Sequence, residues 1–150
     1  MAGVCYDTSI LIAYRPEELP AGYRLSAVVM MEMTAGARDE EGVKRWEQAR
    51  KLAEREGTLL VPNAEDWWLA GKVINSLQRG RASRRTGRVP PMSAAEGQRI
   101  TRDVLIARTV KREGALLVTE NVGDFELIAR YCRVRYKSGR EYFGHGPGEA

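Results

Sequence analysis

The sequence of 150 residues carries a formal net charge of +4 and is 43% hydrophobic. A chain of this length buries roughly 68–70% of its unfolded surface on folding, so we expect one globular domain over residues 1–150 rather than a disordered chain. No segment approaches the roughly 20 apolar residues of a membrane-spanning helix, and the first residues lack the basic start of a signal peptide. Neither a membrane anchor nor secretion is therefore expected.

Short apolar segments alternate along the chain with longer amphipathic ones. The expected strands are 4–6, 24–26, 58–61, 115–119 and 132–136. The expected helices are 10–14, 27–35, 39–56, 64–77, 93–113 and 123–130. Strands that alternate with helices are typical of a parallel sheet covered on both faces. The pattern therefore predicts an α/β protein, a three-layer α/β/α sandwich with a five-stranded parallel sheet.

Two helix starts have the spacing of a capping box, in which a polar residue is followed three positions later by an acid. They are Asn63 with Asp66, and Ser93 with Glu96. In such a box each side chain accepts a hydrogen bond from the other residue's backbone, which stabilises the first turn. This spacing predicts helices that begin directly after Asn63 and Ser93.

Two cysteines and a single histidine limit the chemistry of the chain. Cys5 and Cys132 lie in expected strands, which favours buried, reduced thiols in a cytoplasmic protein over a disulfide framework. His145 lies in a glycine- and proline-containing tail, about 139–150, that we expect to be flexible. Ser-His-Asp, Cys-His and His-ligated zinc sites thus lack their usual imidazole within the fold. An enzyme of this sequence would have to rely on carboxylates.

Polar residues follow the first and fourth expected strands. Asp7 comes directly after the first strand, while Thr119, Asn121 and Asp124 come at the end of the fourth. The carboxyl ends of parallel strands lie at the same edge of a sheet, where ligand sites of open α/β folds are found. These side chains therefore meet if the first and fourth strands are neighbours.

Two further acids lie on apolar helix faces. Asp103 is three residues after Ile100 and four before Ala107, and Glu32 is four residues after Val28. A charged carboxylate on a buried face is costly unless it is paired or bound to a metal. Both positions therefore suggest a function beyond solubility.

Each acid also has a purely structural interpretation. Asp7 and Asp124 could cap the helices that follow them, Glu32 could be half exposed, and Asp103 could pair with an arginine such as Arg108. The four acids together favour a shared site. Their hard oxygen ligands select Mg²⁺ or Mn²⁺ over zinc, and such a cluster suits hydrolysis of phosphodiesters by a metal-activated water.

Basic residues concentrate in one glycine- and serine-containing segment, 79–88. Its arginines are Arg79, Arg81, Arg84, Arg85 and Arg88. A solvated loop is one interpretation of this composition. The other is phosphate binding, because the arginine side chain matches phosphate oxygens and displaces counterions from a polyanion. The second interpretation assigns phosphate contacts to Arg81, Arg84, Arg85 and Arg88.

Four segments of the sequence resemble PIN-domain nucleases, and within them the VapC-type toxins of bacterial toxin–antitoxin pairs. These segments are YDTSILIAY (6–14), LSAVVMMEMTAG (25–36), RDVLIARTVKREGALLVTEN (102–121) and GDFELI (123–128). They span nearly the whole chain in the family's order. The combination is specific, although DTS alone is common.

The resemblance implies a single PIN-like domain whose fourth strand lies beside the first. It implies an endoribonuclease that depends on Mg²⁺ or Mn²⁺, forms a homodimer and is silenced by a VapB-like antitoxin. By the same resemblance, the metal-holding acids are Asp7, Glu32, Asp103 and Asp124, and the residues that orient them are Thr119 and Asn121. Arg102 and Glu120 depart from the family pattern, because they place charges where small or apolar residues are frequent.

Two other protein classes also place aspartates at strand ends. A haloacid-dehalogenase-like phosphatase needs a second Asp two residues after the first, where this chain has Ser9. A phosphotransfer receiver domain needs an Asp at the end of its third strand, where this chain has Val61, Pro62 and Asn63. Both classes are disfavoured. The remaining alternative is a PIN-like RNA-binding or RNA-processing protein outside a toxin–antitoxin module.

Overall fold

The computed structural model describes residues 3–149. Its main sheet has three parallel strands in the order β1, β4, β5. The strands are β1 (Val4–Tyr6), β4 (Leu116–Thr119) and β5 (Tyr136–Ser138). Cys5 of β1 pairs with Leu117 of β4, so the prediction that the fourth strand lies beside the first is confirmed.

A second parallel pair of strands lies next to β1. It consists of β2 (Leu25–Ser26) and β3 (Leu59–Leu60). A single bridge between Cys5 and Arg24 connects this pair to the main sheet, and the Arg24 backbone N–H donates to the Val4 carbonyl at 2.7 Å. The expected five-stranded sheet is therefore not confirmed, because the described residues form sheets of three and two strands.

The shortness of β2 and β3 has a local cause at each strand end. The Ser26 side chain accepts hydrogen bonds from the backbone N–H groups of Val28 and Val29, so a helix begins directly after β2. β3 is followed closely by Pro62, which has no backbone N–H to donate to a neighbouring strand. The bridge to β1 is made by Arg24, directly before β2, whereas β3 pairs with β2.

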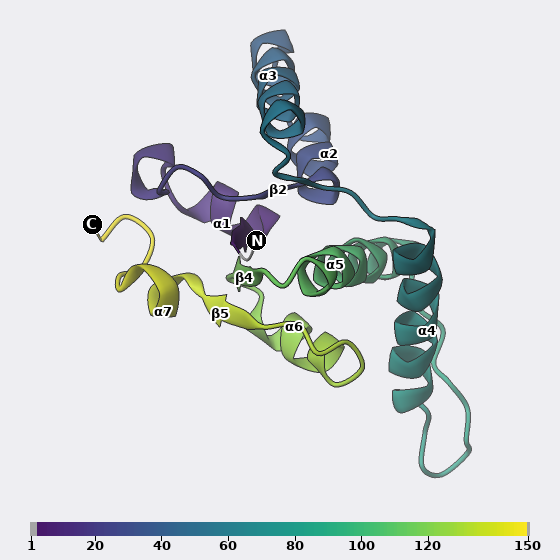
Figure 1. Ribbon diagram of the computed structural model, residues 1–150. Coiled ribbons are helices and arrows are strands. Elements are labelled where there is room, and N and C mark those ends of the chain that lie inside the picture. Colours follow the sequence, from purple (N-terminus) through teal and green to yellow (C-terminus); the bar gives the residue numbers. More distant parts are fainter. Residues whose placement is uncertain (1–2, 150) are drawn as a thin grey trace.

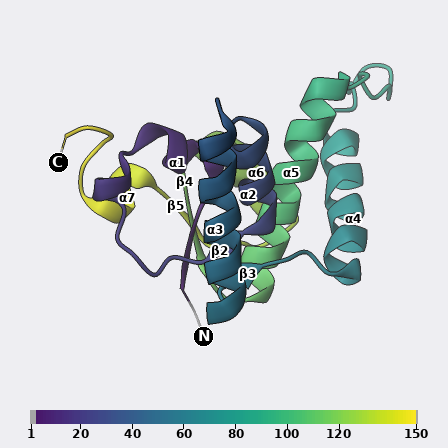
Figure 2. The same cartoon turned by 90° about the horizontal axis from the view of Figure 1, so that it is seen from above.

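Helices occupy both sides of the strands. They are α1 (Thr8–Ala13), the 3₁₀ helix η1 (Pro16–Glu18), α2 (Ala27–Ala35), α3 (Glu40–Glu56), α4 (Ala64–Gly80), α5 (Ala94–Arg112), α6 (Val122–Ala129) and α7 (Gly139–Phe143). In both views α7 lies on one side of the strands, while α4 and α5 lie on the other (Figure 1, Figure 2). This arrangement agrees with the expected α/β class. None of the helices in residues 3–149 combines the length and the apolar character needed to cross a bilayer.

The most buried helix is α5, which packs between the strands and α4. Its residues 103–107 are all buried, together with Thr109 and Val110. They join Leu117 and Phe125 in the larger hydrophobic core. Because α5 is covered on most sides, an acid in its middle lies within the protein and not in bulk water. This placement is what gives Asp103 its unusual surroundings.

The C-terminal segment differs from expectation in two ways. The fifth strand begins at Tyr136 and not at Cys132, because the Cys132 backbone N–H donates to Ile128 and continues the turn after α6. Within the segment expected to be flexible, about 139–150, residues 139–143 form α7, and the rings of Phe143 and Tyr14 lie 4.8 Å apart between centroids. The Tyr14 hydroxyl also donates to the backbone carbonyl of His145 at 3.0 Å. Residue 150 lies outside the described residues.

Candidate active site

Asp7 is held rigidly at the carboxyl end of β1. Its side chain is 2% exposed and accepts hydrogen bonds from the Thr8 backbone N–H at 2.8 Å and from the Ser9 hydroxyl at 3.0 Å. The Thr119 hydroxyl donates to the same carboxylate at 2.8 Å. Asp7 therefore caps α1, as the structural interpretation proposed, and also contacts the end of β4. The same carboxylate thus caps the helix and binds the hydroxyl at the end of the neighbouring strand.

The end of β4 is tied to β1 through two hydroxyl groups. Thr119 is fully buried and accepts a hydrogen bond from the Asn121 backbone N–H at 2.9 Å. Ser9 accepts a hydrogen bond from the Glu120 backbone N–H at 3.0 Å. Ser9 was not predicted as a site residue, although its position two residues after Asp7 in a polar turn was a usable signal. The backbone N–H of Asn121 therefore holds the Thr119 hydroxyl in place, whereas the Asn121 side chain makes no capping hydrogen bond to α6.

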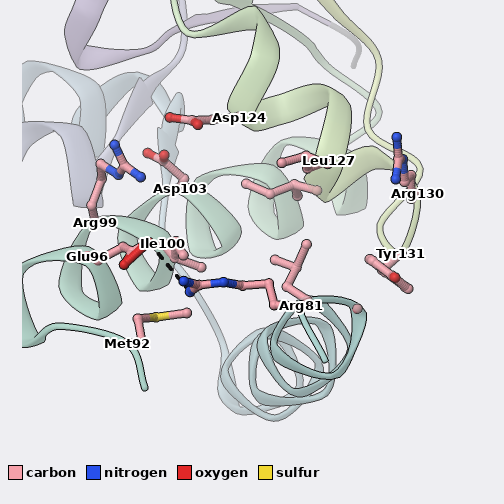
Figure 3. A pocket seen from close by; sticks show the side chains of 13 residues that line it. Arg81, Met92, Glu96, Arg99, Ile100, Asp103, Asp124, Leu127, Arg130 and Tyr131 are labelled. Atoms are coloured by element: carbon pink, nitrogen blue, oxygen red, sulfur yellow. Dashed lines mark ion pairs between the residues drawn. The ribbon is translucent and has the colours of Figure 1, made fainter. Parts of the chain in front are cut away.

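Asp103 and Asp124 line the same cavity from two different helices. Asp103 on α5 is 7% exposed, and Asp124 lies in the first turn of α6. Their carboxylates lie near one another in Figure 3. Asp124 could cap α6 by its position, yet the cap residue of that helix is Asn121. The charge of the Asp124 carboxylate acts on both Asp7 and Asp103.

Glu32 reaches the same region from α2 and is paired with an arginine. The Arg102 Nε atom lies 3.5 Å from Glu32 Oε2, and the Glu32 side chain is 22% exposed. This ion pair involves one of the two charges that depart from the family pattern. Arg102 thus partly neutralises one of the predicted metal-holding acids.

The four carboxylates affect one another electrostatically. Burial and then the charges of neighbouring acids raise the pKa of Asp103 to about 7. Those acids are Asp7, Asp124 and Glu32, in decreasing order of effect. Burial also raises the pKa of Asp7 above its usual range, in spite of the hydrogen bonds from Thr119, Ser9 and Thr8. Four acids from three helices and a strand end therefore share one electrostatic environment.

Glu32 follows the same pattern. Burial raises the pKa of Glu32, the charge of Arg102 opposes that rise, and the charge of Asp7 adds to it. A cation placed among these acids would relieve their mutual repulsion, and carboxylate oxygens are the ligands that Mg²⁺ and Mn²⁺ prefer. The donor chemistry thus fits a hard divalent cation. Within residues 3–149, however, no three acidic, histidine or cysteine side chains form a ready-made metal site.

The structural alternative for Asp103, a pair with Arg108, does not occur. Arg108 instead pairs with Asp66 at 3.3 Å, and Arg112 pairs with the same carboxylate at 2.9 Å. The Asp66 side chain is fully buried between α4 and α5. Asp66 also completes the predicted capping box with Asn63. The buried acid with arginine partners is therefore Asp66 and not Asp103.

The arginines divide into two groups. Arg81 lines the cavity beside Asp103 and pairs with Glu96 at 3.5 Å. Arg84, Arg85 and Arg88 are exposed in the segment after α4 and do not line that cavity. Arg99 and Arg130 do line it, and neither was predicted. Arg99 had a signal in the sequence, because a residue four positions before Asp103 lies one helical turn away on the same face.

Comparison with solved structures identifies chains of similar fold. No protein-family model matches the sequence, and no curated protein matches it. The structure is similar to a chain of VapBC-1 from nontypeable Haemophilus influenzae, with 22% identity and a TM-score of 0.55 over 90% of this chain and 96% of the other. It is similar to a chain of DNA-bound VapBC from Salmonella typhimurium, with 21% identity and a TM-score of 0.57 over 92% and 98%.

A chain of FitAB bound to the IR36 DNA fragment gives a further match, with 19% identity and a TM-score of 0.54 over 90% of this chain and 94% of the other. At identities this low, the structural similarity shows a shared fold. The activity has to be inferred from the residues of the site. All these matches extend over nearly the whole of both chains. The chain therefore has the fold of chains found in VapBC and FitAB complexes, in agreement with the sequence resemblance to VapC-type PIN domains.

Proposed function

We propose that the chain is a divalent-metal-dependent endoribonuclease and the toxin of a VapBC-like toxin–antitoxin pair. The observation that carries this proposal is the group of four carboxylates near the carboxyl ends of β1 and β4, in which the charges of neighbouring acids raise the pKa values of Asp7, Glu32 and Asp103. Such mutual repulsion has a cost in stability unless a cation or a proton offsets it. The fold shared with VapBC chains supports the same function.

Asp7, Glu32, Asp103 and Asp124 would hold Mg²⁺ or Mn²⁺. When bound, the metal supplies an activated water and neutralises charge on the phosphate. Thr119 and Ser9 fix the orientation of Asp7 through their hydroxyl groups. Burial of Asp7 and Asp103 keeps bulk water away from their carboxylates, which strengthens every electrostatic interaction at this position.

The first prediction concerns the ends of the cleaved RNA. With Mn²⁺, the protein should cut total RNA to products with 5′-phosphate and 3′-hydroxyl ends, because water and not the ribose attacks phosphorus. Mapping of the cut ends, with a chelator-treated sample as control, measures this. Products with 2′,3′-cyclic phosphates would contradict the mechanism, since they require attack by the 2′-hydroxyl group.

The proposed partners are a second copy of the chain and a VapB-like antitoxin that presents a basic side chain to the acidic site. An apolar groove of about 760 Å³ lies between α2, α4 and α5. Its lining includes Met31, Val61 and Trp67, which are 52%, 51% and 58% exposed. We assign this groove to the antitoxin, whose association would cover these side chains.

Light scattering at micromolar concentration tests the proposed homodimer. A mass that corresponds to a single chain would contradict it.

The second prediction compares two adjacent tryptophans. Trp67→Glu should weaken capture of the proposed VapB-like antitoxin by at least about ten-fold, because buried tryptophans carry much of the energy of interfaces. Trp68→Glu is the matched control, since Trp68 is 64% exposed, does not line the groove and carries Lys72 above its ring. Titration of labelled antitoxin measures both affinities. Equal effects of the two substitutions would place the antitoxin elsewhere.

A further inference from the structure

A second cavity, here called the basic cavity, lies between α4, α5 and the turn after α6. Its volume is about 240 Å³, and its polar lining includes Lys72 and Ser76 on α4 with Arg108 and Lys111 on α5. None of the described acids lines it, whereas acids do line the cavity of the candidate active site. The basic cavity is therefore a separate feature of the molecule with the opposite charge.

Helical spacing brings these four side chains together. Lys72 and Ser76 are four residues apart on α4, and Arg108 and Lys111 are three residues apart on α5, so each pair lies on one helix face. The two helices lie side by side in both views (Figure 1, Figure 2). Two polar faces of neighbouring helices thus meet at the basic cavity, over the buried side chain of Val73.

The positive charge at this position exceeds the negative charge. Asp66 pairs with Arg108 at 3.3 Å and with Arg112 at 2.9 Å, and its side chain is fully buried. Lys72 and Lys111 are exposed and form no ion pair within residues 3–149. Two arginines thus share one carboxylate, and no described acid pairs with either lysine.

The cavity also contains a donor that lacks an acceptor. The Arg108 Nε atom is buried and has no hydrogen-bond partner in residues 3–149. A buried donor without a partner is costly, so an oxygen atom supplied by a ligand would be stabilising here. The charges of Lys111 and Arg108 oppose the rise in the pKa of Cys132, which places both cations close to the buried thiol that also lines the cavity.

We infer that the basic cavity binds the terminal phosphate group of a small anion, either inorganic phosphate or a phosphomonoester. Such a group carries a charge of roughly −1.5 to −2 at neutral pH, which matches the charges of Lys72 and Lys111. Its oxygens also accept hydrogen bonds from the Arg108 guanidinium group and the Ser76 hydroxyl. This site does not depend on the proposed nuclease function.

Size and charge both limit the ligand to one terminal phosphate group. Sites for small molecules span roughly 300–1,000 Å³, so a cavity of about 240 Å³ holds the phosphate group and leaves the remainder of a larger ligand outside. A phosphodiester of a nucleic-acid backbone carries a single negative charge. It would leave one of the two lysine charges unopposed, and a terminal phosphate group is therefore the better match.

Thermal unfolding of the full chain tests this site, because a ligand that binds only the folded state raises the melting temperature. A chelator keeps divalent ions from linking phosphate to the acidic site. The probes are inorganic phosphate, glycerol phosphate and dimethyl phosphate, at constant ionic strength with sodium chloride as the reference. The first two should raise Tm, whereas dimethyl phosphate, with one charge, should act like chloride. Tighter binding of glycerol phosphate would identify a phosphomonoester as the ligand, and tighter binding of phosphate would identify the free anion.

Two substitutions and a matched control assign the effect to the cavity. Lys72→Gln and Lys111→Gln should each raise the apparent Kd for phosphate by roughly ten-fold, because a charge-assisted hydrogen bond is lost. Both lysines are exposed, so the variants should fold. Lys44→Gln removes the same charge from the exposed surface of α3, away from the cavity, and should leave the Kd unchanged.

The buried thiols provide a second measurement on the unsubstituted chain. Cys132 lines the basic cavity, whereas Cys5 lies on β1. Phosphate in the cavity should slow the reaction of Cys132 with N-ethylmaleimide more than that of Cys5. Mass spectrometry of the digested protein measures the two rates in the same sample.

An unchanged Tm in phosphate would overturn the assignment, as would lysine variants that respond like Lys44→Gln, because the anion would then bind elsewhere. Dimethyl phosphate that binds as tightly as phosphate would also overturn it, since the cavity would then suit a nucleic-acid backbone. Equal slowing of Cys132 and Cys5 would likewise contradict a ligand located at the cavity. RNA cleavage is measured separately, and its absence would leave the phosphate site unaffected.

Discussion

Asp103→Asn should abolish RNA cleavage and at the same time make the metal-free protein more stable. The side chain keeps its shape but loses a charge that burial and three neighbouring acids disfavour. A rise in pKa from 3.8 to about 7 corresponds to roughly 4 kcal/mol against the charged form in the folded state. Because Asn is itself a buried polar group, we expect a gain of about 1–4 kcal/mol in the free energy of unfolding at pH 8.

The pH dependence of this gain has a definite sign. With a raised pKa, the folded protein binds the Asp103 proton more tightly than the unfolded chain does. The stability that this proton contributes is complete below the unfolded pKa, near 3.8, and is lost as the pH rises through about 7. The difference in unfolding free energy between Asp103→Asn and wild type should therefore be small at pH 4, grow toward pH 7 and level off above it.

Melting curves with chelator and with Mn²⁺, at several pH values, measure both effects. Mn²⁺ should stabilise wild type by mass action and the Asn variant much less. Glu126→Gln serves as the control for loss of an acid, because Glu126 is exposed on α6. A metal-free Asp103→Asn protein that melts below wild type, with an unchanged response to Mn²⁺, would show that Asp103 has a structural role only.

Asp66→Ala should be the most destabilising single substitution among the acids. It leaves Arg108 and Arg112 without the carboxylate that lies 3.3 and 2.9 Å from them, and it removes the capping box at the start of α4. Arg108 is only 12% exposed, so its charge has little access to water after the change. Loss of one partner of a buried ion pair costs about 3–5 kcal/mol.

Urea unfolding measures this loss, and the neighbouring acid provides the control. Glu65 lies in the same first turn of α4 but is exposed, so Glu65→Ala should change stability by only about 0.5 kcal/mol or less. If Asp66→Ala and Glu65→Ala were equally mild, the two arginines would have to find water or another acceptor without cost. That result would contradict the burial of this ion-pair group.

The sequence predicted the order of the elements well, because strands and helices here carry clear periodic patterns and capping residues. The capping box of Asn63 and Asp66 is an example, since both partners lie within one turn and depend on no other part of the fold. The sheet was predicted less well. The bridge of Arg24 to Cys5 depends on how far the two backbones approach, which local residue patterns do not encode.

The candidate site was predictable where an acid had an unusual position. Asp103 lay on an apolar helix face and Asp7 at a strand end, and the structure brings both into one electrostatic environment. The partners of these acids were harder to predict. Arg108 could have paired with either Asp103 or Asp66, because the choice depends on which side of α5 faces α4. Arg130 reaches the cavity only through the turn after α6, so its spacing carries no signal.

The burial of both cysteines has a consequence for chemical labelling. Cys5 is fully buried on β1, and Cys132 is 2% exposed after α6. Burial raises the pKa of the Cys5 thiol to about 12 and shifts that of Cys132 in the same direction, so little of the reactive thiolate exists at neutral pH. A maleimide dye should therefore attach to a cysteine introduced on the surface while both native thiols remain unmodified. Slow modification of Cys5 or Cys132 would instead report how often β1 or the turn after α6 opens.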